Sequence, residues 1–279
     1  MKIDYFERGL TVDFAVRYIM VDCTSIAQKA QKRHDLTGAA PKLCAEGILA
    51  SYLLASQIKG EEKLTIQILS QNPKLSFMSD INAKGELRAK LTPNTYPEST
   101  SKLDGVLVVI KHNKHKELYR GVTNIEKCNI AQALHHNLTQ SAQVDTIVQF
   151  FVMQVEDTIQ RAVGLILERL PPTEDLPFLT TEEFFEKYKK MSNQEVWEGL
   201  AERKLRGSQL HDLSSKPISW KCRCSRSKVK SMLFSLGKKE LEEIQKEIGY
   251  AEVTCHFCNE TVLLTNDELQ ELIDQYTNN

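Results

Sequence analysis

Four of the seven cysteines are gathered in two close pairs near the end of this 279-residue chain. Cys222 and Cys224 form a C-x-C motif, and thirty residues later Cys255 and Cys258 form a C-x-x-C motif. Pairs with this spacing can bind one metal ion, because the backbone between two cysteines makes a turn and Zn²⁺ takes four sulfur ligands in a tetrahedron. We therefore expect these four cysteines to hold one Zn²⁺ per chain, with a small domain between the pairs.

Three other uses of these cysteines stay open at this point. A structural zinc ribbon would need no redox chemistry at all. A thiol–disulfide oxidoreductase would need the first cysteine of C-x-x-C at a helix N-terminus, but the β-branched run Thr261–Leu264 predicts the return strand of a hairpin there. A zinc ribbon could also bind RNA or DNA through nearby basic side chains, namely Arg223, Arg226, Lys228 and Lys230.

No catalytic motif accompanies the cysteines, so the chain is not expected to be an enzyme. It contains no glycine-rich phosphate loop, no G-x-S-x-G and no H-E-x-x-H. The histidines inside and outside the cysteine motifs, His256 and the His135–His136 pair, are interpreted as bystanders. The solitary cysteines are interpreted as small buried hydrophobic residues; they are Cys23, Cys44 and Cys128.

Composition predicts a cytosolic globular protein of two domains. Hydrophobic residues make up 41% of the chain, and the formal net charge of -1 provides no basic field to attract nucleic acid. The first residues lack the apolar core of a signal peptide, and no apolar run approaches the length of a membrane span. Disulfides are rare in the cytosol, so paired cysteines there indicate metal or redox chemistry.

The elements that must position the cysteines begin with a mixed sheet-and-helix domain over residues 1–172. Strands and helices alternate irregularly, which predicts the α+β class. Strands are expected at 11–22, 64–69, 75–81, 86–91, 105–110 and 117–123, helices at 24–33, 40–58 and 125–138, and extended or mixed segments at 144–155 and 158–170. The pair Pro171–Pro172 ends this domain, because proline continues neither a helix nor a central strand.

A short helical linker is expected over residues 173–217. Thr180 with Glu183, and Ser192 with Glu195, match the capping box that opens a helix. Helices this short are marginal in water, so they must dock to stay folded. Residues 207–217 are expected to form a polar hinge.

The last segment, residues 218–279, is predicted to be a zinc domain with a thin core. Apolar stripes predict three helices, Gly249 is expected to end the second, and Thr265 with Glu268 forms another capping box. Structural zinc contributes about 10–16 kcal/mol in small peptides, which exceeds the stability of a typical domain of about 5–15 kcal/mol. Loss of zinc should therefore unfold this segment.

The residues around the cysteines resemble the heat shock protein 33 family, the 33 kDa chaperonins. The matching segments, in order, are Trp220–Arg226, Leu233–Gly237 with Glu240–Leu241, Glu252–Cys258 and Asp267–Leu269. Gly85–Arg88 and Tyr119–Val122 resemble the strand motifs of the family's first domain. Two segments depart from the family pattern, Ser141–Thr146 and Ala162–Gly164.

The resemblance implies a redox-regulated, ATP-independent holdase chaperone that responds to oxidative stress. In the family, the four cysteines hold zinc in the reduced, inactive state, and oxidation joins neighbouring cysteines, expels zinc and unfolds the linker. Here that implies disulfides Cys222–Cys224 and Cys255–Cys258, a homodimer when oxidised, and unfolded client proteins as partners. The client surface is expected to include Phe184, Phe185 and Trp197 of the linker.

Overall fold

The structure is a computed structural model, and it describes residues 4–11, 16–142, 145–170, 186, 188, 191–202, 204–205 and 208–276. These residues form two compact units that divide after Trp220. In the described residues no helix is long and apolar enough to cross a membrane. The predicted three-part division of the chain stays a prediction, whereas the α+β class is confirmed.

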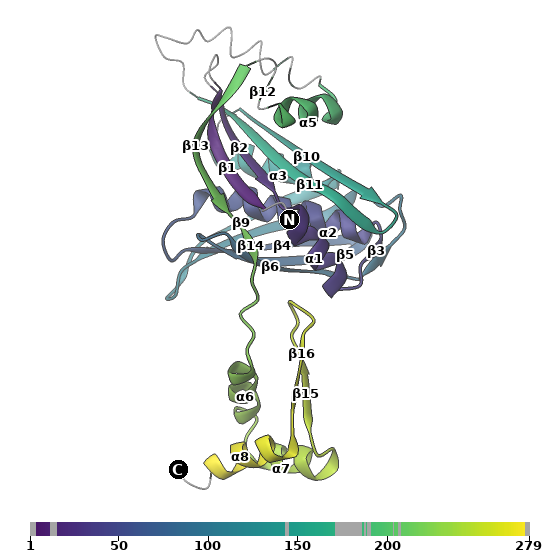
Figure 1. Ribbon diagram of the computed structural model, residues 1–279, viewed down its shortest axis with the longest axis vertical. Helices are drawn as coiled ribbons and strands as arrows, with labels where there is room; N and C mark the ends of the chain where they lie inside the picture. Colours follow the sequence, from purple (N-terminus) through teal and green to yellow (C-terminus); the bar gives the residue numbers. More distant parts are fainter. Residues whose placement is uncertain are drawn as a thin grey trace. The chain divides into compact units, whose positions relative to one another are not determined.

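Two six-stranded sheets build the first unit, with helices between them (Figure 1). The first sheet has the strand order β10-β11-β2-β1-β13-β12. Its strands are β1 (Tyr5–Thr11), β2 (Val16–Asp22), β10 (Thr146–Val155), β11 (Thr158–Arg169), β12 (Lys204–Leu205) and β13 (Ser208–Pro217).

The second sheet has the strand order β14-β6-β5-β4-β8-β9. Its strands are β4 (Lys63–Asn72), β5 (Lys74–Asn82), β6 (Glu86–Thr92), β8 (Leu103–His112), β9 (Glu117–Cys128) and β14 (Ser219–Trp220). The two-residue strands β3 (Thr37–Gly38) and β7 (Thr95–Tyr96) pair in parallel with each other.

The central helix α2 (Ala40–Leu54) is buried on nearly its whole surface, since only Lys42 and Glu46 are not fully covered. It contacts strands of both sheets, and the 3₁₀ turn Ala55–Gln57 continues it, which confirms the predicted buried helix. A helix without a polar face can be accommodated only between two apolar layers. The helices α1 (Thr24–Arg33) and α3 (Ile130–Ala142) complete the middle layer, and α5 (Asn193–Ala201) packs against β10.

Two predictions about this unit are wrong. The helix expected from residue 125 starts only at Ile130, because β9 continues to Cys128 and Asn129 caps α3 with its side chain on the N–H of Gln132. The polar hinge expected at 207–217 is largely the strand β13, which pairs with β1 from Thr11–Leu210 to Tyr5–Pro217.

Long-range polar contacts hold β13 in the sheet. The Tyr18 hydroxyl lies 2.8 Å from Glu7 Oε1 and 2.5 Å from Asp212 Oδ1, and Arg8 Nε donates to Ser214 Oγ at 2.9 Å. Ladder pairing explains how so polar a segment forms a strand.

The second unit consists of three helices and one hairpin. In chain order these are α6 (Arg226–Phe234), α7 (Lys238–Glu247), β15 (Ala251–Thr254), β16 (Thr261–Leu264) and α8 (Asn266–Gln275). Gly249 has a positive φ of 79° after α7, and Thr265 with Glu268 caps α8, so both predicted helix boundaries are confirmed. Its buried apolar core is small and comprises Val229, Leu233, Leu241, Ala251, Leu264, Leu269, Leu272 and Ile273.

Candidate metal centre

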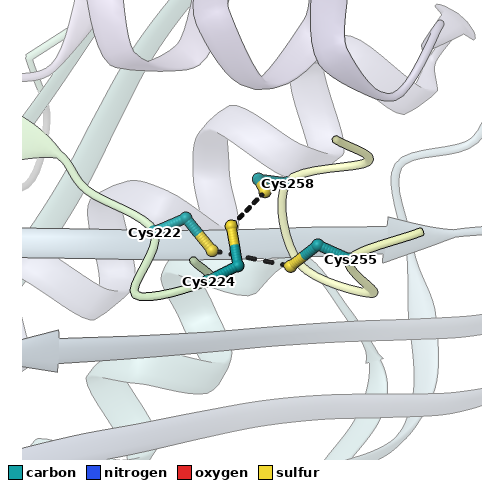
Figure 2. A group of neighbouring side chains, drawn as sticks. All are labelled: Cys222, Cys224, Cys255 and Cys258. Atoms are coloured by element: carbon teal, nitrogen blue, oxygen red, sulfur yellow. Dashed lines mark hydrogen bonds between the residues drawn. The ribbon is translucent and has the colours of Figure 1, made fainter. Parts of the chain in front are cut away.

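The four paired cysteines of the second unit converge on one point (Figure 2). Their sulfur atoms all lie within 4.8 Å of one another. The Sγ atoms of Cys222 and Cys255 are 3.6 Å apart, and those of Cys224 and Cys258 are 3.3 Å apart. Zinc–sulfur bonds of about 2.3 Å place tetrahedral sulfurs about 3.8 Å from one another, so the four thiols fit one zinc-sized ion.

The C-x-x-C pair is held in the tight turn between β15 and β16. The N–H of Cys255 donates to the Glu260 carbonyl at 2.8 Å, and the N–H of Asn259 donates back to the Cys255 carbonyl at 2.9 Å. Asn259 has a φ of 56°, a left-handed conformation that asparagine tolerates better than most residues. The predicted return strand is therefore confirmed, and neither cysteine of this pair lies at a helix N-terminus.

The C-x-C pair lies immediately before α6. Ser225 caps this helix, its hydroxyl accepting from the N–H of Lys228 at 3.3 Å. The partial positive charge of a helix N-terminus favours the ionised form of a nearby thiol. The cysteine pairs thus lie just before α6 and in the hairpin turn, and their sulfurs meet between these two segments.

The pKa values of Cys222, Cys224 and Cys258 are shifted, in different directions. Burial of Cys222 opposes ionisation, but hydrogen bonds from the Cys224 N–H and the neighbouring thiols outweigh it and lower the pKa of Cys222 to about 7. Burial raises the pKa of Cys224 and raises that of Cys258 well above its usual value. One thiol of the cluster therefore ionises readily, whereas four thiolates need a bound cation to coexist.

Basic side chains near the cysteines are engaged with protein groups. Arg226 donates to both carboxylate oxygens of Glu268, at 2.9 and 2.5 Å, and Lys230 lies 3.2 Å from the same carboxylate. Lys228 Nζ donates to the Arg223 carbonyl at 2.6 Å. Arg226 lowers the pKa of Glu268 to about 2. Two of the four basic residues considered for nucleic-acid binding, Arg226 and Lys230, are thus paired with carboxylates of the protein.

The other residues singled out in the sequence lie apart from the centre. Cys23, Cys44 and Cys128 are buried in the first unit, where desolvation raises their pKa values, that of Cys44 to about 12. The His256 ring lies edge-on to Phe257 and is not part of the sulfur cluster. Phe184, Phe185 and the Trp197 side chain lie outside the described residues.

One charged residue was overlooked in the sequence. Glu46 is half-buried on the apolar helix α2, and burial raises its pKa to about 7. The sequence did contain an indication of this residue, because Glu46 is the one acidic residue of α2 and the positions after Lys42 are otherwise apolar or small.

Comparisons with known proteins agree over nearly the whole chain. The family model described as Hsp33 protein matches residues 4–265. Proteins named 33 kDa chaperonin from Bacillus velezensis and Bacillus subtilis are each 30% identical, over 99% of this chain and 100% of theirs. A crystal structure of a 33 kDa chaperonin from Thermotoga maritima superposes with a TM-score of 0.83 at 20% identity, covering 100% of both chains, and therefore has the same fold.

Proposed function

Because this chain belongs to the Hsp33 protein family, we propose that it is a holdase chaperone whose four-cysteine centre acts as a redox switch. In this proposal Cys222, Cys224, Cys255 and Cys258 hold one Zn²⁺ in the reduced state. The convergence of the four sulfurs within 4.8 Å is the observation that carries the proposal. The chain has a chaperone role by its family, and the relatives' names indicate no catalytic activity.

The metal would supply cohesion rather than catalysis. The sulfurs link two chain segments more than thirty positions apart in a unit whose buried apolar core, over residues 221–276, comprises eight side chains. Domains this small usually need a metal or disulfides for stability. Removal of the metal is therefore the event that unfolds the second unit.

Oxidation removes the ligands themselves. Hydrogen peroxide takes two electrons and two protons from each pair of thiols, forms one disulfide and is reduced to water. A disulfide needs its sulfurs about 2.05 Å apart, whereas the Sγ atoms of Cys224 and Cys258 are 3.3 Å apart. The two arrangements are incompatible, so oxidation and metal binding exclude each other.

The family pairing assigns the disulfides to Cys222–Cys224 and Cys255–Cys258. Sulfur contacts of 3.6 and 3.3 Å in this structure join opposite pairs instead, Cys222 with Cys255 and Cys224 with Cys258. A C-x-C disulfide requires its short backbone to distort, which is accommodated once the unit unfolds. Peptide mapping by mass spectrometry after oxidation distinguishes the two pairings.

The proposed clients are unfolded proteins, bound without ATP by apolar side chains of the linker, including Phe184, Phe185 and Trp197. We further propose a homodimer in the oxidised state and a cytoplasmic location, where thiols stay reduced until oxidative stress. Tyr188 of this segment is buried, and its hydroxyl donates to Gln149 Oε1 of β10 at 2.9 Å. Apolar surface of the linker would become available when such contacts break.

A paired measurement tests the proposal. Zinc content and suppression of a client's aggregation are measured on the reduced protein and again after peroxide treatment with warming. We expect about one zinc per reduced chain, loss of zinc on oxidation, and suppression of aggregation only in the oxidised sample. A reduced protein without metal, or equal suppression in both states, would refute the switch.

A further inference from the structure

An open edge of the first sheet borders a cavity. The strand β10 is outermost in its sheet and pairs only with β11 among the described strands (Figure 1). The cavity, of about 360 Å³, lies along five consecutive residues of this strand, Val148–Val152. Its other walls come from α2 and from the first turn of α3. The cavity therefore follows the length of a strand edge.

The hydrogen-bond phase of β10 shows which backbone groups face this edge. The N–H of Arg169 donates to the Asp145 carbonyl at 3.0 Å, so the pair 145–169 is bonded within the β10–β11 ladder. Bonded pairs alternate along antiparallel strands, which turns the N–H and C=O groups of Val148, Phe150 and Val152 away from β11. In the described part of the chain these groups have no hydrogen-bond partner.

The cavity also has a charged wall. Glu46 is half-buried there, and its carboxyl group has no hydrogen-bond or ion-pair partner among the described residues. Lys42, one helical turn earlier, is exposed at the rim. Burial raises the pKa of Glu46 to about 7, and the charge of Lys42 offsets only part of this shift, so a cation entering the cavity would gain a carboxylate partner. Side chains of Val148, Phe150 and Val152 pack toward the helices and supply apolar walls.

We propose that this groove binds an extended polypeptide segment as an added strand on β10, with a lysine or arginine of that segment paired to Glu46. Free main-chain donors and acceptors fit a partner in extended conformation whatever its side chains. The lone carboxylate selects a basic residue at one position.

This proposal goes beyond the redox switch. Its residues all lie between positions 42 and 152 of the first unit, and none is a cysteine of the metal centre. Binding should therefore occur in the reduced protein, and it stands or falls independently of activation by oxidation.

The test uses the full-length reduced protein and a fluorescent peptide of about ten residues, with alternating valine and threonine and one central arginine. Amide hydrogen exchange is measured with and without the peptide. We expect new protection at Val148, Phe150 and Val152, and no change at the intervening amides that already bond to β11. Replacement of the arginine in the peptide by glutamate should weaken binding about tenfold, because a charged hydrogen bond becomes a repulsion.

Matched variants separate the two parts of the groove. Glu46→Gln should weaken binding of the arginine peptide about tenfold, whereas Glu98→Gln, the same change at an exposed position, should leave it unaltered. Val148→Pro removes one outward N–H that the β11 ladder does not use, and should reduce binding with the fold retained. Peptide binding without alternate amide protection would overturn the proposal. The proposal would also be overturned if arginine amide alone protected the same backbone amides equally well, or if no binding were seen at millimolar peptide.

Discussion

Removal of the metal from the reduced protein tests how the second unit is stabilised. Structural zinc provides about 10–16 kcal/mol in small domains, and a typical domain is stable by about 5–15 kcal/mol, so the metal-free unit should be unfolded. The helical signal of α6, α7 and α8, which contain 9, 10 and 10 residues, should then disappear. Far-ultraviolet circular dichroism with a chelator measures this loss, and hydrogen exchange assigns it to residues 221–276.

Two cysteine variants provide the matched control for that measurement. Cys258→Ser removes a buried ligand of the centre and should unfold the second unit even with zinc present. Cys128→Ser changes a buried thiol of the first unit and should leave zinc content and exchange in the second unit unaltered. Undiminished protection of α6, α7 and α8 in the chelated, reduced protein would show that eight apolar side chains suffice without a metal.

Three further outcomes follow from buried groups. Glu46 has its pKa raised to about 7 by burial, so its contribution to stability is lost as pH rises from about 4.3 to 7. Glu46→Gln should reduce the change in the free energy of unfolding by urea over this pH range by about 1–2 kcal/mol, a modest value because Glu46 is only half-buried. If the pH dependence is the same in the variant, the raised pKa of Glu46 is contradicted. Leu241→Ala empties a fully buried position and should destabilise the second unit by about 2–5 kcal/mol, which lowers the peroxide needed to release half the zinc. Leu236→Ala, at an exposed position, should change neither the stability of the second unit nor the peroxide needed to release zinc. Equal effects of the two substitutions would show that burial of Leu241 does not stabilise the unit. Tyr188→Phe removes the bond to Gln149 and should speed hydrogen exchange in α5, with a cost of about 1 kcal/mol; unaltered exchange would show that this bond does not hold the segment.

The convergence of the four cysteines was predictable because its information is local. Two cysteines within a few residues must share one turn, and a β-branched run after Cys258 indicates the strand that returns from it. Capping boxes at Ser192 and Thr265 are local in the same sense, and both are present. The buried helix α2 was indicated by its composition alone.

Features that depend on distant partners were missed. The segment Ser208–Pro217 is polar and has no clear alternation, yet it pairs with β1, about two hundred positions earlier in the sequence, from Leu210 to Pro217. The edge of β10 is equally invisible in sequence, since it depends on which strand neighbours which. Glu46 acquires its shifted pKa only from the surroundings that the fold creates.

The position of β13 has a consequence for how the protein leaves the ribosome. The strand β1 is synthesised before both of its neighbours, and one of them, β13, emerges about two hundred positions later. The nascent chain must therefore carry a bare strand edge until β13 has been synthesised. The strands β11 and β13 belong to the same sheet, so Arg169 and Ser208 are both anchored in it although they are far apart in the sequence.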